Sequence, residues 1–225
     1  MRTRLVAALL LLAGLPARAQ VAVVDEGSFT VTRDGRTGRE DFRIVRAPSG
    51  SLPSFVATGV TTLGSTRTTT LLRTDTLGKP LGYQLEGRES GAVRDRINLQ
   101  VGADRLSMRA QTARGESARE LFRRPGMMVL DEASVHQYFL VAMIGDGAAL
   151  PVVLPRANVV VEVRVSSRGD EPIEIAGSQV VARHFVVTDP RGDRDVWVDR
   201  EGRVLRVEAP AIGLSAIRDA LPGER

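Results

Sequence analysis

The chain has 225 residues and no cysteine, with 31 lysine and arginine residues against 27 aspartate and glutamate residues. The absence of cysteine excludes disulfide bonds, thiol catalysis and cysteine metal sites. Aromatic residues make up only 4% of the chain and no RNA-binding aromatic pair is present, so the sequence argues against nucleic-acid binding.

The first 19 residues have the pattern of a secretory signal peptide. Residues 5–15 form an almost unbroken apolar run that is too short to span a bilayer. Ala17 and Ala19 then form a cleavage signal before Gln20. We therefore expect residues 20–225 to form a single β-rich domain that is exported to the periplasm or secreted. Without a cysteine at the cleavage point we expect no lipid anchor, and no later segment reaches transmembrane length.

Removal of the signal peptide changes the charge balance. Three of the 31 basic residues, Arg2, Arg4 and Arg18, lie in the signal segment, which leaves 28 basic against 27 acidic residues. Lys79 is the only lysine, and the arginines alternate with acidic residues, as they do in residues 191–201. This pattern predicts a solvated surface of mixed charge rather than a patch that binds polyanions.

Most of the mature chain alternates polar and apolar residues with a period of two, which is typical of half-buried strands. Asp34 and Gly35 lie between two such segments and predict a hairpin turn, and residues 168–170 predict another turn. Short turns join antiparallel neighbours. We therefore predict a mostly β fold in which about ten or eleven strands form a single large curved antiparallel meander sheet, a half-open barrel, with one or two short helices.

Two segments depart from the strand pattern. Residues 131–145 predict a helix with Asp131 as its N-cap, although a buried strand over residues 138–144 is an alternative. Residues 212–221 predict a short amphipathic helix. The apolar stripe of the first helix consists of Val135, Tyr138, Phe139, Ala142 and Met143.

No catalytic or metal-binding motif is complete. The two histidines, His136 and His184, do not have the spacing of a zinc site, and no serine-nucleophile or calcium-loop motif is present. The neighbouring acids Asp131 and Glu132 are expected to be solvated. We therefore expect a protein that is not an enzyme and has no metal or cofactor, in which His184 is a structural residue within a strand.

Two hairpins resemble those of known proteins. One contains Phe29, Asp34, Gly35, Gly38 and Phe42, and the other reads W-x-D-x-x-G-R. The second motif consists of Trp197, Asp199, Gly202 and Arg203. Together the hairpins resemble uncharacterised bacterial envelope families, known only as domains of unknown function. These families are in turn similar to lipoprotein carriers of the LolA and LolB type, a similarity that implies a half-open barrel around an apolar cavity covered by helices.

The pattern favours two functional hypotheses from different classes. The first is a soluble periplasmic binding module that holds a lipid or another apolar ligand in the hollow of the sheet. Its candidate ligand-binding residues are Val135, His136, Tyr138, Phe139 and Met143. In this hypothesis His136 holds a polar head group at the pocket rim, whereas a surface histidine at the start of the helix is the alternative. The second hypothesis is an envelope assembly or interaction protein with a filled core and no ligand.

The signal-peptide interpretation predicts a mature N-terminus at Gln20, because Ala17 and Ala19 fit the small-residue preference of signal peptidase. N-terminal sequencing of the stable cellular form should read from Gln20. Recovery of Met1 on that form would contradict export through this signal.

Overall fold

The computed structural model describes residues 21–49, 52–113 and 115–223, so the predicted signal peptide lies outside the described residues. The strands are β1 (Ala22–Arg33), β2 (Arg36–Ser49), β3 (Leu52–Leu63), β4 (Thr66–Asp75), β5 (Pro80–Glu89), β6 (Ala92–Val101), β7 (Arg105–Thr112), β8 (Gly115–Phe122), β9 (Met128–Val129), β10 (Ala149–Leu154), β11 (Val159–Ile175), β12 (Ser178–Asp189), β13 (Gly192–Val198), β14 (Val204–Ala209) and β15 (Leu214–Arg218). The helices are η1 (Val135–Tyr138), α1 (Phe139–Ile144) and η2 (Pro210–Ile212), of which only α1 is an α-helix. Within the described ranges, no helix has the length and apolar character needed to cross a membrane.

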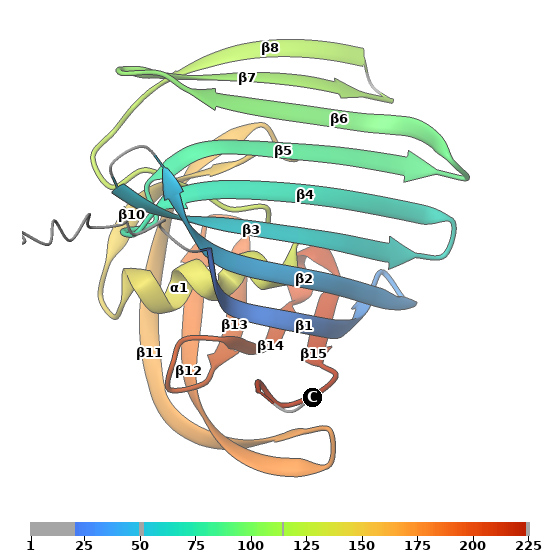
Figure 1. The fold of residues 1–225 in the computed structure, drawn as a ribbon, viewed down its shortest axis with the longest axis vertical. Helices are drawn as coiled ribbons and strands as arrows, with labels where there is room; N and C mark the ends of the chain where they lie inside the picture. Colours follow the sequence, from blue (N-terminus) through green and yellow to red (C-terminus); the bar gives the residue numbers. More distant parts are fainter. Residues whose placement is uncertain (1–20, 50–51, 114, 224–225) are drawn as a thin grey trace, which may run out of the picture.

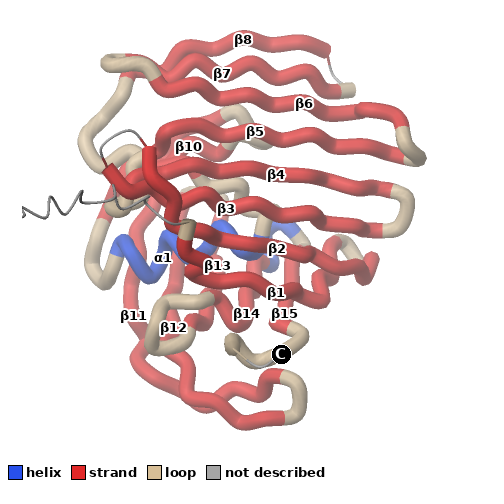
Figure 2. The backbone as a smooth tube through the Cα atoms, viewed as in Figure 1, coloured by secondary structure: helices blue, strands red, loops and turns tan. Residues whose placement is uncertain are grey.

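All fifteen strands belong to one sheet, which curves strongly but does not close into a barrel (Figures 1 and 2). From β1 to β8 the chain forms a meander that ends at one edge of the sheet. It then crosses to the other edge at β9 and returns through successive strands until β15 pairs with β1. The predicted fold class is confirmed. The strand number exceeds the prediction, and the sheet is mixed because β9 and β10 are parallel.

The prediction of a turn at residues 168–170 is wrong, because β11 runs straight through this stretch. The register against β12 shifts between Ser167 and Gly169, so one extra residue is taken up in a bulge. Gly169 has a φ of 94°, which permits the distortion without a steric penalty. The resulting β11–β12 hairpin extends below the rest of the sheet in Figure 1.

The helix predicted over residues 212–221 is also wrong. This segment contains β15, which lies between β14 and β1. Leu214, Ala216 and Arg218 are buried, whereas Ser215 and Ile217 are more exposed, and this is the period of a strand. The hydrogen bonds of β15 with β1 and β14 outweigh the weak helical pattern of so short a segment.

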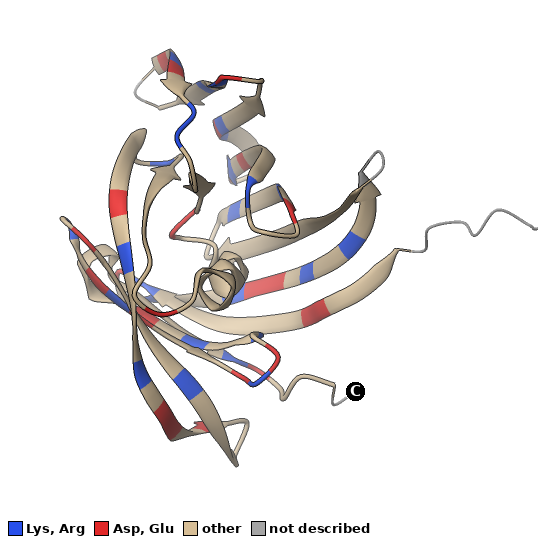
Figure 3. Cartoon of the chain, turned by 90° about the vertical axis from the view of Figure 1, so that its left-hand side faces the viewer, with Lys and Arg blue, Asp and Glu red and all other residues tan. Residues whose placement is uncertain are grey.

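The parallel pair β9–β10 requires a crossover, and residues 130–148 provide it. Both η1 and α1 belong to this crossover, and α1 lies between the two diverging parts of the sheet (Figure 3). The prediction of a helix in this region is confirmed, but the helix is shorter and Asp131 is not its cap. Ser134 precedes η1, and the alternative strand over residues 138–144 is wrong.

Side chains of the crossover fill the concave face of the sheet. Val135 and Tyr138 have no exposed surface, and they join one core cluster with strand residues such as Phe29, Leu72 and Leu99. The Phe139 ring packs edge-on against Phe55 of β3, with ring centroids 5.9 Å apart. The main hydrophobic core is therefore the contact between the sheet and its own crossover.

A second, smaller cluster contains Trp197. The indole of Trp197 stacks on the His184 ring at 4.4 Å, its N–H donates to the Glu171 carboxylate, and the Arg206 guanidinium lies over its face. His184 Nε2 is 2.7 Å from Asp195 Oδ1, so this histidine has a structural role within the sheet. The remaining members of this cluster are Ile173, Ile175, Val180, Ala182, Leu205 and Leu221.

The W-x-D-x-x-G-R segment forms the turn between β13 and β14. Asp199 Oδ1 accepts hydrogen bonds from the backbone N–H groups of Glu201 and Arg203 at 3.0 and 2.8 Å. The Arg203 guanidinium donates to Asp199 Oδ2 at 2.6 Å. Gly202 has a φ of 82°, a conformation that favours glycine. Three of the four motif residues thus build the turn, whereas Trp197 packs on the neighbouring strands.

Replacement of Trp197 by alanine should lower the free energy of unfolding by about 3–5 kcal/mol, because an 8%-exposed indole leaves a large void. Urea unfolding followed by circular dichroism measures this change. Val181→Ala is the matched control, since Val181 is 56% exposed and its loss should change stability by less than about 0.5 kcal/mol. Equal midpoints for wild type and Trp197→Ala would contradict a packing role.

Candidate functional site

Buried polar residues gather where the crossover enters the hollow of the sheet. Asp131 and Glu132, expected to be solvated, are 1% and 8% exposed. Asp131 Oδ2 accepts hydrogen bonds from the Tyr83 hydroxyl at 2.6 Å and from the Ser134 hydroxyl at 2.9 Å. The Arg156 guanidinium donates to Asp131 Oδ1 at 2.6 Å. The expectation fails because two of these partners, Tyr83 of β5 and Arg156 of the β10–β11 turn, are distant from Asp131 in the sequence.

The ionisation of this group follows from its partners. Burial opposes the charged carboxylate, but the Arg156 guanidinium and the hydrogen bonds from Arg156, Tyr83 and Ser134 together hold the pKa of Asp131 below its usual range. Burial and the neighbouring carboxylate raise the pKa of Tyr83 well above its usual value. Asp131 is therefore an ionised anchor for Arg156, and Tyr83 is a neutral donor.

A second ion-pair cluster joins the crossover to the β12–β13 hairpin. Arg191 donates to both oxygens of Glu132, at 3.0 and 2.6 Å. Arg194 Nη2 donates to Glu132 at 2.9 Å and to Asp189 at 2.8 Å. Arg194 and Asp189 are almost fully buried, so the prediction of a solvated charged surface is wrong here. Burial opposes ionisation of Asp189, but hydrogen bonds from Arg191 and the nearby Arg194 lower the pKa of its carboxyl group.

The third polar contact pairs His136 with Glu40 of β2. His136 Nδ1 lies 2.8 Å from Glu40 Oε1, and neither side chain has exposed surface. The Glu40 carboxylate also accepts hydrogen bonds from the backbone N–H groups of Val135 and His136, at 3.0 and 2.8 Å. The His136 ring lies against Gly59, where an added Cβ would come within 2.4 Å of it. The prediction of a surface histidine is therefore wrong, and the ring lies inside the core rather than at a rim.

These contacts hold the crossover in place against the sheet. Each carboxylate faces an arginine or a histidine, and the Ser134 hydroxyl donates to Asp131 rather than to a base. In the described part of the chain, no cluster of three or more His, Asp or Glu residues is suited to hold a metal ion.

The candidate ligand residues all lie in the crossover. Val135, His136, Tyr138 and Phe139 are buried against the sheet, and Met143 is half-buried at the edge of the core. Five surface pockets of the described chain have other residues in their linings. The structure thus brings these five side chains into one packed segment, and it leaves their part in ligand binding a prediction.

A pocket of about 650 Å³ with both apolar and charged lining residues lies where the chain crosses from β8 to β9. It is formed by the β4–β5 turn, the β6–β7 turn and the β8–β9 connection. We call it the end pocket, and its lining residues are Asp75, Leu77, Lys79, Ala103, Asp104, Phe122, Arg123, Arg124, Pro125, Gly126, Met127 and Met128. Sequence reasoning missed this site, and the two signals in the sequence were the only lysine and the adjacent pair of methionines.

Some polar side chains of the end pocket form hydrogen bonds within the protein, and others form none. Asp75 Oδ1 accepts hydrogen bonds from the backbone N–H groups of Leu77 and Lys79, both at 2.9 Å, so its charge is turned toward the protein. Arg123 donates to the carbonyl oxygens of Gly102 and Ala103. Among the described residues, the side chains of Lys79 and Arg124 have no ion-pair partner. Two cations are therefore available to a ligand at this rim.

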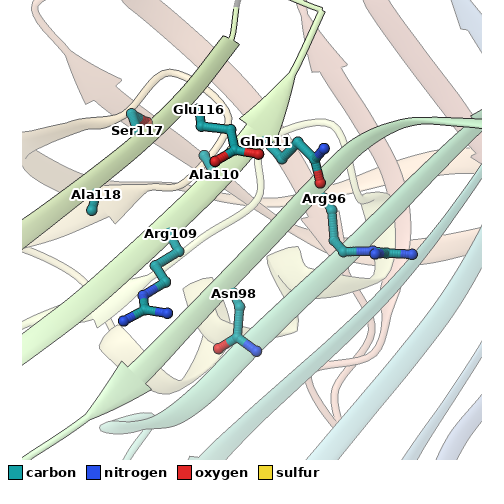
Figure 4. A pocket seen from close by; sticks show the side chains of 8 residues that line it. All are labelled: Arg96, Asn98, Arg109, Ala110, Gln111, Glu116, Ser117 and Ala118. Atoms are coloured by element: carbon teal, nitrogen blue, oxygen red, sulfur yellow. The ribbon is translucent and has the colours of Figure 1, made fainter.

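A second, polar pocket of about 440 Å³ lies on the outer face of β6, β7 and β8 (Figure 4). The strand register aligns its side chains in two rows. These rows are Arg96, Gln111 and Glu116, and Asn98, Arg109 and Ala118. Arg96 is already paired with Glu86 at 2.9 Å, and the apolar residues of these strands face the other side of the sheet.

Comparison with known proteins supports the fold. Residues 149–218, from β10 to β15, match DUF6134, a family described as a domain of unknown function. A β-barrel-like protein of the domain of unknown function DUF1849 from Brucella abortus has a similar structure, with a TM-score of 0.52 and 11% sequence identity over 89% of this chain and 97% of that chain. No curated protein matches the chain. Similarity to domains of unknown function is thus confirmed, while the C-terminal motif as a family mark and the LolA and LolB similarity stay predictions.

Acid should weaken the Asp131 anchor, because its carboxyl group has a lower pKa in the folded than in the unfolded state. The stabilisation is complete above the unfolded value of about 3.9 and is lost as the pH falls through the lower folded pKa. Asp131→Asn should therefore lower the free energy of unfolding by about 2–3 kcal/mol at pH 7. The difference in unfolding free energy between the variant and wild type, called the gap below, should narrow under about pH 4.

Denaturant unfolding between pH 2 and pH 7 measures this gap. Asp170→Asn is the matched control, since Asp170 is exposed and should show no such dependence. A gap for Asp131→Asn that stays constant down to pH 2 would contradict the charge-based explanation.

Proposed function

We propose that this protein is an exported, soluble binding module of the cell envelope that is not an enzyme and that holds an apolar, acyl-bearing ligand in the end pocket. The proposal rests on a pocket that combines apolar side chains with two cations, Lys79 and Arg124, for which the described residues provide no ion-pair partner, beside a hollow that the chain itself fills.

The end pocket is a better ligand site than the hollow of the sheet. A ligand could bind in the hollow only if the crossover moved out of it. This movement would break the contacts of Asp131, Glu132 and Glu40 with their partners. Breaking buried ion pairs is costly, because each leaves an uncompensated charge in a low-dielectric interior. In this proposal the crossover residues Val135, His136, Tyr138, Phe139 and Met143 keep the hollow filled and do not line the end pocket.

The chemistry of the end pocket suits an amphiphile. Its volume of about 650 Å³ is within the usual range for small-molecule sites. Met127 and Met128 offer flexible, polarisable side chains that adapt to a chain-like ligand. Lys79 and Arg124 are placed to hold an anionic head group at the opening. The proposed ligand class is therefore a fatty acid or another anionic molecule with one acyl chain.

The filled hollow favours one alternative, an envelope assembly or interaction protein without a ligand. The edge strand β8 is exposed along most of its length, from residues 115 to 120. Its charged side chains, including Glu116 and Glu120, are typical of edges protected against non-specific pairing. This alternative requires a specific envelope protein that binds to the edge strand β8.

Two Phe→Ala variants separate ligand binding from core packing. Phe122 is 73% exposed and lines the end pocket, so Phe122→Ala should reduce the affinity for a fluorescent fatty acid about tenfold, with stability unchanged. Phe139 is 8% exposed in the core, so Phe139→Ala should lower stability by about 3–5 kcal/mol. Its affinity for the probe, measured on folded protein, should stay within about twofold of wild type.

Fluorescence titration and urea unfolding of the three proteins provide both measurements. Wild-type protein that takes up no fatty-acid probe would defeat the binding hypothesis and favour the interaction protein. A loss of affinity in Phe139→Ala but not in Phe122→Ala would indicate that the ligand binds in the hollow and not in the end pocket.

A further inference from the structure

Large apolar side chains are exposed at one end of the N-terminal half of the sheet. Leu77 in the β4–β5 turn is 81% exposed, Phe122 at the end of β8 is 73% exposed, and Leu52 at the start of β3 is 69% exposed. These are the three most exposed large hydrophobic residues in the described part of the chain. We call them the apolar end.

The three residues share this end because of the meander. Neighbouring strands from β1 to β8 are antiparallel, so the start of β3, the β4–β5 and β6–β7 turns and the end of β8 lie on the same side (Figure 1). The turns at the opposite end have small or polar residues instead. These are Asp34 and Gly35, Gly64 and Ser65, and Ser90 and Gly91. The three most exposed large apolar side chains thus lie at one end of these strands.

Basic side chains accompany the exposed apolar ones. Lys79 is two residues from Leu77, and Arg123 and Arg124 follow Phe122. The Arg105 guanidinium lies 5.0 Å from the centre of the Phe122 ring. The acids of this region are Asp75, Asp104 and Glu120. Glu120 pairs with Arg105 at 2.6 Å, and the Asp75 carboxylate accepts hydrogen bonds from backbone N–H groups of its own turn. Apolar tips with neighbouring cations are the pattern of a protein that inserts into the interface of an anionic bilayer.

We propose that the apolar end docks on an anionic lipid bilayer, with Leu52, Leu77 and Phe122 entering the boundary between head groups and acyl chains. The three side chains project from separate strand ends and turns rather than from one flat face, which suits a deformable lipid surface better than a rigid protein partner. The inference rests on the proposed function, because Leu77 and Phe122 also line the end pocket. Docking would therefore place the end pocket next to the acyl chains of the bilayer.

Cosedimentation with lipid vesicles tests the docking. Wild-type protein should bind vesicles of phosphatidylglycerol and phosphatidylcholine, and should bind pure phosphatidylcholine about tenfold more weakly. The double variant Leu77→Glu with Phe122→Glu should lose at least about tenfold in affinity for the anionic vesicles. Lys79→Gln with Arg124→Gln should lose several-fold, and added salt should remove the difference from wild type.

Val181→Glu is the matched control, because Val181 is a 56%-exposed apolar residue in the β11–β12 hairpin, away from the apolar end. It should bind vesicles as wild type does, and circular dichroism should show that every variant is folded. The docking proposal is overturned if wild-type protein stays in solution with anionic vesicles, or if Val181→Glu loses as much affinity as the double variant. It is also overturned if light scattering shows a dimer that the double variant dissociates, since a second copy then covers the apolar end.

The outcomes separate this inference from the proposed function. Protein that takes up the fatty-acid probe in solution but ignores vesicles retains the end pocket as a ligand site and loses the docking proposal. Protein that binds vesicles without taking up the probe supports docking, and the ligand-binding proposal then fails.

Discussion

The parallel pairing of β9 with β10 is the constraint on which the rest of this structure depends. Two parallel strands cannot be joined by a tight turn, so residues 130–148 must cross over one face of the sheet. The crossover passes over the concave face, where Val135, Tyr138 and Leu140 bury their side chains against the strands. An open fifteen-stranded sheet thereby gains a core without closing into a barrel.

Charged contacts decide how the crossover is held. Asp131, Glu132 and His136 each meet a partner of opposite charge or hydrogen-bonding character from a different part of the sheet. Buried ion pairs add little net stability compared with apolar packing, but an unpaired member is very unfavourable. These contacts therefore specify one position of the crossover, while the apolar side chains supply most of the stabilisation.

Local patterns in the sequence predict local structure well. Alternation of apolar residues identified the sheet, and Asp34 and Gly35 do adopt positive φ angles in the predicted hairpin turn. The same reasoning failed at β15, where five residues are too few to separate a helical from a strand period. It also failed at the bulge in β11, where turn-forming residues lie within a continuous strand.

The candidate site was harder to predict, because its parts are distant in sequence. Glu40 and His136 are separated by 96 residues, and the sequence around each gives no sign of the other. The end pocket likewise combines two turns and a connection that meet only through the meander. The acids at 131 and 132 looked like ordinary surface residues, since their arginine partners come from other elements.

The position of β15 has a consequence for how the molecule is assembled. Because β15 lies between β1 and β14, β1 remains an edge strand until β15 has been added. Contacts between residues this far apart lose much chain entropy on closure, and sheets of this kind fold slowly. The two halves of the sheet are joined through five residues, Leu214–Arg218, so the continuity of the whole sheet depends on this one short strand.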